Sequence, residues 1–156
     1  MKHLALIILT ALLVIACKNN ANQNVQDNTK TQDSINASLE GTWELVGFYN
    51  YINNKVSDSF NPSTGYRQVK MYTSTKVMWS KNVPTDSTEW FGYGYYSING
   101  DTLTEVLDYG SKMMKKIINE RKEFKYELDL KENTFSQIEV DEEGNRIYSE
   151  NYKRIE

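Results

Sequence analysis

The sequence predicts an all-β domain folded as an eight-stranded, up-and-down antiparallel barrel. All 11 Tyr, 3 Trp and 5 Phe lie after residue 38, and aromatic and β-branched side chains suit a half-buried pleated sheet. Short turn-forming segments divide this region into runs of strand length, and no helical pattern long enough for a βαβ unit interrupts them. An up-and-down barrel removes exposed sheet edges by closing on itself. A β-sandwich is the alternative architecture.

The turns set the number of strands. Asn99-Gly100-Asp101 is the strongest hairpin signal, because Asn-Gly tolerates the positive φ angles of a type I′ turn. Residues 53–65, with Pro62, are expected to form a polar loop. Strands are expected over residues 41–51, 66–73, 76–81, 89–98, 102–109, 121–130, 134–140 and 146–155. A barrel of about eight strands has room for interior side chains or for one small ligand.

Residues 110–120 (GSKMMKKIINE) break the strand pattern. Met113 and Ile117, and likewise Met114 and Ile118, are four residues apart, with lysines between them. As one or two helical turns, this segment would form an apolar and basic flap at a barrel mouth. Such a flap could gate a ligand or contact anionic lipid. The alternative is a long connection that covers one barrel end or begins the next strand.

The N-terminal residues have the pattern of a secretory signal peptide. Leu4–Ala16 is an apolar stretch that is shorter than the roughly 20 residues a transmembrane helix needs and fits the apolar region of a signal peptide. It ends in Val14-Ile15-Ala16-Cys17, which resembles the bacterial lipobox. The resemblance implies that residues 1–16 are removed and that Cys17 is lipidated, anchoring a cell-envelope lipoprotein. The alternative is an ordinary signal peptide with an incidental Cys.

A polar segment follows Cys17. Lys18–Ser38 contains six Asn, three Gln and no aromatic residue, too little apolar surface to offset the entropy of ordering. We therefore expect residues 17–38 to be a lipidated, flexible tether and residues 39–156 to be the β domain. Surface-exported lipoproteins of the Bacteroidetes type often carry acidic residues after the Cys. Their absence here favours attachment to the outer membrane on its periplasmic side.

The composition excludes much catalytic chemistry. His3 and Cys17 are the one His and the one Cys, so the domain cannot contain a Ser-His-Asp triad, a Cys-His pair, a His or Cys metal site or a disulfide. Acidic residues are scattered, with no evident carboxylate pair of the glycosidase kind. Without residues 1–16 the chain has 17 basic and 21 acidic residues, a net charge of −4, which disfavours nucleic-acid binding. We expect no enzyme, no metal and no cofactor.

Gly41-Thr42-Trp43 opens the first expected strand and resembles the Gly-x-Trp signature of the lipocalins and the wider calycin superfamily. In that superfamily the Trp closes one end of the barrel and a basic residue of the last strand packs across it. The resemblance implies that Arg154 contacts Trp43 through a cation–π interaction. Residues 70–73, 77–79 and 96–105 are also similar to the lipocalin-like domains of Bacteroidetes lipoproteins.

Glu105 is the most informative polar residue. Strand alternation over residues 102–109 puts it on the same face as three apolar or aromatic residues, and a buried carboxylate is costly unless it is paired. The functional interpretation is a polar anchor in a ligand cavity. The alternatives are a solvent-facing side chain or a structural ion pair with Arg67, Arg121 or Arg154.

The central strands supply an aromatic set. Tyr and Trp combine an apolar body with a hydrogen-bonding tip, which suits an amphiphilic ligand. The candidate ligand-binding residues are Glu105 together with Tyr72, Trp79, Trp90, Tyr93 and Tyr95. The expected function is binding of a small apolar or amphiphilic molecule in the barrel. The alternative is a structural or interaction lipoprotein whose barrel is filled by its own side chains.

Overall fold

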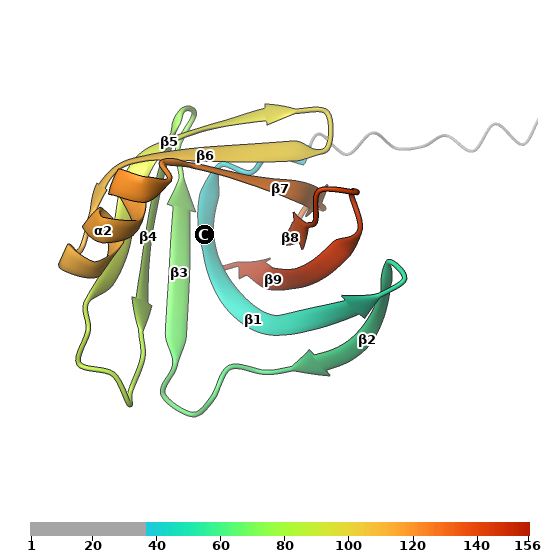
Figure 1. Cartoon of the computed structure of the whole chain (residues 1–156), viewed down its shortest axis with the longest axis horizontal. Coiled ribbons are helices and arrows are strands. Elements are labelled where there is room, and N and C mark those ends of the chain that lie inside the picture. Colours follow the sequence, from blue (N-terminus) through green and yellow to red (C-terminus); the bar gives the residue numbers. More distant parts are fainter. Residues whose placement is uncertain (1–36) are drawn as a thin grey trace, which may run out of the picture. The chain divides into compact units, whose positions relative to one another are not determined.

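The structure, a computed structural model, describes residues 37–156. The predicted signal peptide, Cys17 and nearly all of the predicted tether lie outside the described residues. The described part contains nine antiparallel strands and one helix (Figure 1). They are β1 (Gly41–Ile52), β2 (Lys55–Phe60), β3 (Arg67–Tyr72), β4 (Lys76–Asn82), β5 (Trp90–Asn99), β6 (Thr102–Gly110), α2 (Lys112–Glu120), β7 (Glu123–Leu130), β8 (Thr134–Val140) and β9 (Arg146–Arg154).

Eight of the strands form a hydrogen-bonded ring. The sheet runs β2-β1-β3-β4-β5-β6-β7-β8-β9, and an additional β1–β9 pairing closes the ring and leaves β2 outside it. The all-β class and the antiparallel, sequential strand order are therefore as predicted. The ring is not a regular barrel, because β1 changes partner along one edge: Gly41–Glu44 pair with β3, whereas Phe48–Ile52 pair with β2. In Figure 1, β1 accordingly follows a long arc from β3 towards β2.

The prediction of a polar loop over residues 53–65 is wrong, because Lys55–Phe60 form β2. Asn53 and Asn54 have φ angles of 51° and 61°, so both central residues of the β1–β2 turn have the positive φ of a type I′ hairpin. All six residues of β2 are exposed. An exposed strand has no buried face to enforce alternation of apolar and polar residues, which is why its sequence resembled a loop.

Of the two alternatives for residues 110–120, the structure contains the helical one. The Ser111 hydroxyl caps α2 by accepting a hydrogen bond from the Met114 backbone N–H at 3.4 Å. Met114 and Ile118 are buried against Leu107, so packing of one apolar face stabilises this short helix. Within residues 37–156, no helix is long and apolar enough to span a membrane.

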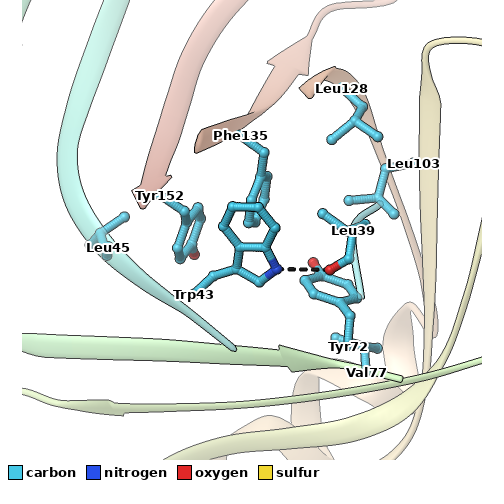
Figure 2. Close-up of a cluster of buried hydrophobic side chains, with 9 residues drawn as sticks. All are labelled: Leu39, Trp43, Leu45, Tyr72, Val77, Leu103, Leu128, Phe135 and Tyr152. Carbon is cyan, nitrogen blue, oxygen red and sulfur yellow. Dashed lines mark hydrogen bonds between the residues drawn. The ribbon is translucent and has the colours of Figure 1, made fainter. Parts of the chain in front are cut away.

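The main hydrophobic core surrounds Trp43 at one end of the ring (Figure 2). The Trp43 side chain is fully buried, and its indole N–H donates a hydrogen bond to the Leu39 carbonyl at 2.7 Å. The Trp43 ring packs edge-on against Phe135, with 4.9 Å between the ring centroids. Phe135 stacks in turn on Tyr152 at 4.6 Å. The Arg154 guanidinium lies 4.0 Å from the Trp43 ring centroid, so the contact that the lipocalin resemblance implies is present.

Candidate functional site

Polar side chains point into the ring from four strands. Gln68 and Lys70 come from β3, Glu105 from β6 and Gln137 from β8, and each is at most 6% exposed. Glu150 of β9 joins them through hydrogen bonds to Gln68 and Gln137. Because alternate residues of a strand share a face, each of these strands contributes to one interior site. We call Gln68, Lys70, Tyr72, Glu105, Gln137, Glu150 and Tyr152 the polar network.

Lys70 and Glu105 form a buried ion pair at the centre of the network. The Lys70 ammonium donates to both Glu105 carboxylate oxygens, at 2.8 and 3.1 Å, and to the Gln137 side-chain oxygen at 2.6 Å. The Tyr72 hydroxyl donates to the same carboxylate at 2.5 Å. Glu105 thus faces inward, as the ligand-anchor interpretation requires. Its cationic partner is Lys70 and none of the three arginines considered from the sequence.

Glu150 provides a second carboxylate. Its Oε2 atom accepts hydrogen bonds from the Gln68 and Gln137 amides, each at 3.0 Å, and from the Tyr152 hydroxyl at 2.5 Å. Gln137 therefore connects Glu150 to the Lys70–Glu105 ion pair, since its side-chain oxygen accepts a hydrogen bond from Lys70 while its side-chain nitrogen donates one to Glu150. Hydrogen bonds of this kind rigidify a buried polar group and offset its desolvation.

Burial and the two carboxylates keep the surrounding phenols neutral. Desolvation raises the pKa of Tyr72 well above its ordinary value, and the negative charge of Glu105 adds to the shift. The pKa of Tyr152 is likewise raised well above its ordinary value, mainly by desolvation and secondly by the charge of Glu150. The same two causes raise the pKa of Tyr66 to about 12. The Tyr72 and Tyr152 hydroxyls donate to carboxylates, and the Tyr66 hydroxyl donates to the Gln68 side-chain oxygen at 2.6 Å.

We expect the free energy of unfolding to fall as the pH rises above 10. Below pH 10 the phenols are protonated in both states, whereas between pH 10 and 12 the unfolded chain loses protons that the folded Tyr66 retains. Buried Tyr72 and Tyr152 act in the same direction, and each tyrosine contributes at most about 1.4 kcal/mol per pH unit. Urea unfolding at a series of pH values measures the slope. A free energy that stays constant up to pH 11 would contradict the buried phenol–carboxylate contacts.

A cavity of about 250 Å³ adjoins the polar network. Its polar lining comprises Gln68, Lys70, Glu105, Tyr126, Gln137 and Glu150, with Lys81 also contributing. The remaining lining, here called the apolar wall, comprises Trp79, Trp90, Leu107, Met114, Ile117 and Phe124. Helix α2 supplies Met114 and Ile117, so the segment that interrupts the strand pattern builds part of this wall. The cavity is consequently amphiphilic, with a charged and hydrogen-bonded side next to an aromatic and aliphatic one.

Of the ligand-binding residues expected from the sequence, Trp79, Trp90 and Glu105 line the cavity. Tyr72 does not line it and instead hydrogen-bonds Glu105 from within the core. Tyr93 and Tyr95 do not line it either, because the buried, inward positions of β5 belong to Gly92 and Gly94. A Cβ atom on Gly92 would lie 2.9 Å from the Trp79 ring. One on Gly94 would lie 2.0 Å from the Val106 carbonyl oxygen.

The sequence prediction omitted most of the polar network. Gln68 and Lys70 precede Tyr72 at two-residue intervals on β3, so assigning Tyr72 to the interior would have placed both of them there. They were overlooked because Lys and Gln are mostly exposed in folded proteins. Gln137 and Glu150 carry no local signal, since only the pairing of distant strands brings them together. Within residues 37–156, no group of three or more His, Cys, Asp or Glu side chains could hold a metal ion.

Comparison with known proteins adds one structural likeness. The chain is similar to the crystal structure of an uncharacterized protein from Bacteroides eggerthii, with a TM-score of 0.49 and 15% sequence identity over 75% of this chain and 99% of that chain. No protein-family model and no curated protein matches the sequence.

Proposed function

We propose that the domain binds a small amphiphilic molecule in the cavity beside the polar network. The observation that carries this proposal is that a buried ion pair, Lys70–Glu105, and the apolar wall line the same cavity. Small-molecule sites combine an apolar, aromatic lining with a few fixed polar groups in this way. The domain would hold its ligand without transforming it, since the residues of the site are engaged in hydrogen bonds among themselves.

The lining also limits the size and shape of the ligand. A volume of about 250 Å³ lies just below the range of about 300–1,000 Å³ typical of drug-sized ligands, so the proposed molecule is small. Trp79 and Trp90 offer flat aromatic surfaces for its apolar part. Met114 of α2 has a flexible side chain that adapts to different shapes.

We further propose that the chain is a lipocalin-like lipoprotein anchored through Cys17 in the outer membrane and facing the periplasm. The lipobox-like Val14-Ile15-Ala16-Cys17 sequence supports the anchor. The Gly41-Thr42-Trp43 motif and the Trp43–Arg154 contact support the lipocalin-like assignment. A tethered binding domain of this kind would retain its ligand close to the membrane surface.

The second candidate is a structural or interaction lipoprotein without a ligand. The Trp43 end of the ring favours it, because side chains fill that end. A further supporting observation is that, in residues 37–156, no buried side-chain N or O atom lacks a hydrogen-bond partner. The polar network therefore does not require a ligand to satisfy it. What distinguishes the candidates is occupancy of the cavity.

Native mass spectrometry of the full chain extracted from its own membranes tests the proposed function. We expect a small molecule to remain bound to the unaltered protein and to be lost from Met114→Trp, which would fill the cavity. Met113→Trp is the matched control, because Met113 lies on the exposed side of the same helix and its replacement should leave the bound mass unchanged. A ligand-free mass for all three proteins would contradict the proposal and favour the structural candidate.

A further inference from the structure

We infer that the ligand carries a positively charged hydrogen-bond donor, a primary or secondary ammonium group, that binds the Glu150 carboxylate. This inference rests on the proposed function and names the chemical class of ligand. It follows from which hydrogen-bonding groups of the polar network are already used and from the fact that Glu150 takes part in none of the ion pairs within residues 37–156.

The Lys70 ammonium, the cationic donor of the polar network, has no N–H bond left for a ligand. An ammonium has three N–H bonds, and Lys70 makes three contacts, two to Glu105 and one to Gln137, at 2.6–3.1 Å. Gln68 directs its amide nitrogen to both Glu150 and Tyr152. Among the described residues of the cavity, the donors left for a ligand are the Lys81 ammonium, which lies over the Trp90 ring, and three uncharged groups, the second N–H of Gln137, the Tyr126 hydroxyl and the Trp79 indole N–H. A carboxylate or phosphate would therefore find no free charged donor in the polar network itself and would have to bind Lys81, outside that network.

Glu150 retains accepting capacity. All three of its hydrogen bonds from described residues go to Oε2, which leaves Oε1 without a protein donor in that part of the chain. A carboxylate can accept about four hydrogen bonds through its two oxygens. Of the ion pairs formed within residues 37–156, none includes Glu150. The cavity lining thus contains a carboxylate that lacks a counter-charge.

Two lysines and two glutamates line the cavity, so the formal charges of the lining balance. Lys70 and Glu105 neutralise each other. Lys81 lies over the Trp90 ring at 4.5 Å, and Asp86 accepts from the Trp90 indole at 3.0 Å, so this acid lies beside the second cation. Lys81 and Glu150 are then the two charges of the lining that take part in none of the ion pairs formed within residues 37–156, and Glu150 is the one that belongs to the polar network. A ligand cation would supply Glu150 with a counter-charge, and the Trp79 ring would attract it further through a cation–π interaction.

A series of three probes that share one apolar body tests the inference. The probes are 2-phenylethylammonium, 2-phenylethanol and phenylacetate, titrated calorimetrically into the full chain at neutral pH. A hydrogen bond to a charged group contributes about 1.5–3 kcal/mol, so we expect the ammonium to bind at least about tenfold more tightly than the alcohol. Phenylacetate should also bind more weakly than the ammonium, because its carboxylate would meet the negative charge of Glu150. If the alcohol or phenylacetate binds as tightly as the ammonium, the inference is overturned while ligand binding in the cavity stands.

Two variants identify the carboxylate responsible. Glu150→Gln should remove the preference for the ammonium and leave the affinity for 2-phenylethanol unchanged. Glu139→Gln, at an exposed position of β8, is the charge-matched control and should retain the full preference. If Glu150→Gln retains it as well, the assignment to Glu150 is wrong. Should Glu150→Gln fail to fold, the probe series on the unaltered protein still decides, and binding of none of the probes overturns both the inference and the proposed function.

Discussion

Replacing Lys70 by Met is expected to lower the free energy of unfolding by about 3–5 kcal/mol. The Lys70 and Glu105 side chains are each 3% exposed, so the variant leaves a carboxylate buried without its cation. It also removes the hydrogen bond to Gln137. Urea denaturation monitored by circular dichroism measures the change.

Two further variants separate the buried charge from the loss of side-chain packing. Arg67→Met removes the exposed ion pair with Glu44, whose arginine is 63% exposed, and should change the stability by less than about 1 kcal/mol. The double variant Lys70→Met, Glu105→Leu removes both buried charges and should be more stable than Lys70→Met alone. If Lys70→Met destabilises the domain no more than Arg67→Met does, the buried ion pair is not as described.

Replacing Trp43 by Ala should also lower the free energy of unfolding by about 3–5 kcal/mol, the usual effect of truncating a large buried aromatic. The side chain is fully buried and packs edge-on against Phe135. Its loss would leave the Leu39 carbonyl without the indole N–H and Arg154 without the ring beneath it. Figure 2 shows how the indole occupies the middle of this cluster.

Tyr109→Ala is the matched control for Trp43→Ala. Tyr109 is also an aromatic residue of a ring strand, but it is 57% exposed, and surface substitutions usually change stability by about 0.5 kcal/mol or less. Loss of its contact with Tyr93, at 5.2 Å between ring centroids, adds slightly to the expected decrease in the free energy of unfolding. Equal effects of the two substitutions in urea denaturation would show that Trp43 is not at the centre of the core.

Much of the fold could be predicted from the sequence because its signals are local. The Asn99-Gly100-Asp101 turn lies between β5 and β6, and strand alternation correctly turned Glu105 inward. Strand β2 escaped prediction because no buried face imposes a pattern on it. Helix α2 could be stated only as an alternative, since its stability comes from packing Met114 and Ile118 on the sheet.

The candidate site could be predicted less completely from the sequence than the fold. Trp79 and Trp90 were identified from residue type, and both line the cavity. Tyr93 and Tyr95 were chosen by residue type as well but do not line the cavity, because residue type alone cannot tell which face of β5 is buried. Packing of Trp79 over Gly92 and of the β6 backbone against Gly94 decides that face. Lys70 and Glu105 lie 35 positions apart in the sequence, and no local sequence pattern predicts that they pair.

The central claim is that the cavity lined by the polar network and the apolar wall holds a ligand. The most direct measurement is a titration of the full chain with 2-phenylethylammonium, followed by nitrogen–proton correlation NMR spectra of the three Trp indole groups. We expect the indole signals of Trp79 and Trp90, which line the cavity, to shift, and that of Trp43, enclosed at the filled end, to stay in place. Indole signals of Trp79 and Trp90 that do not move at saturating probe would contradict the account.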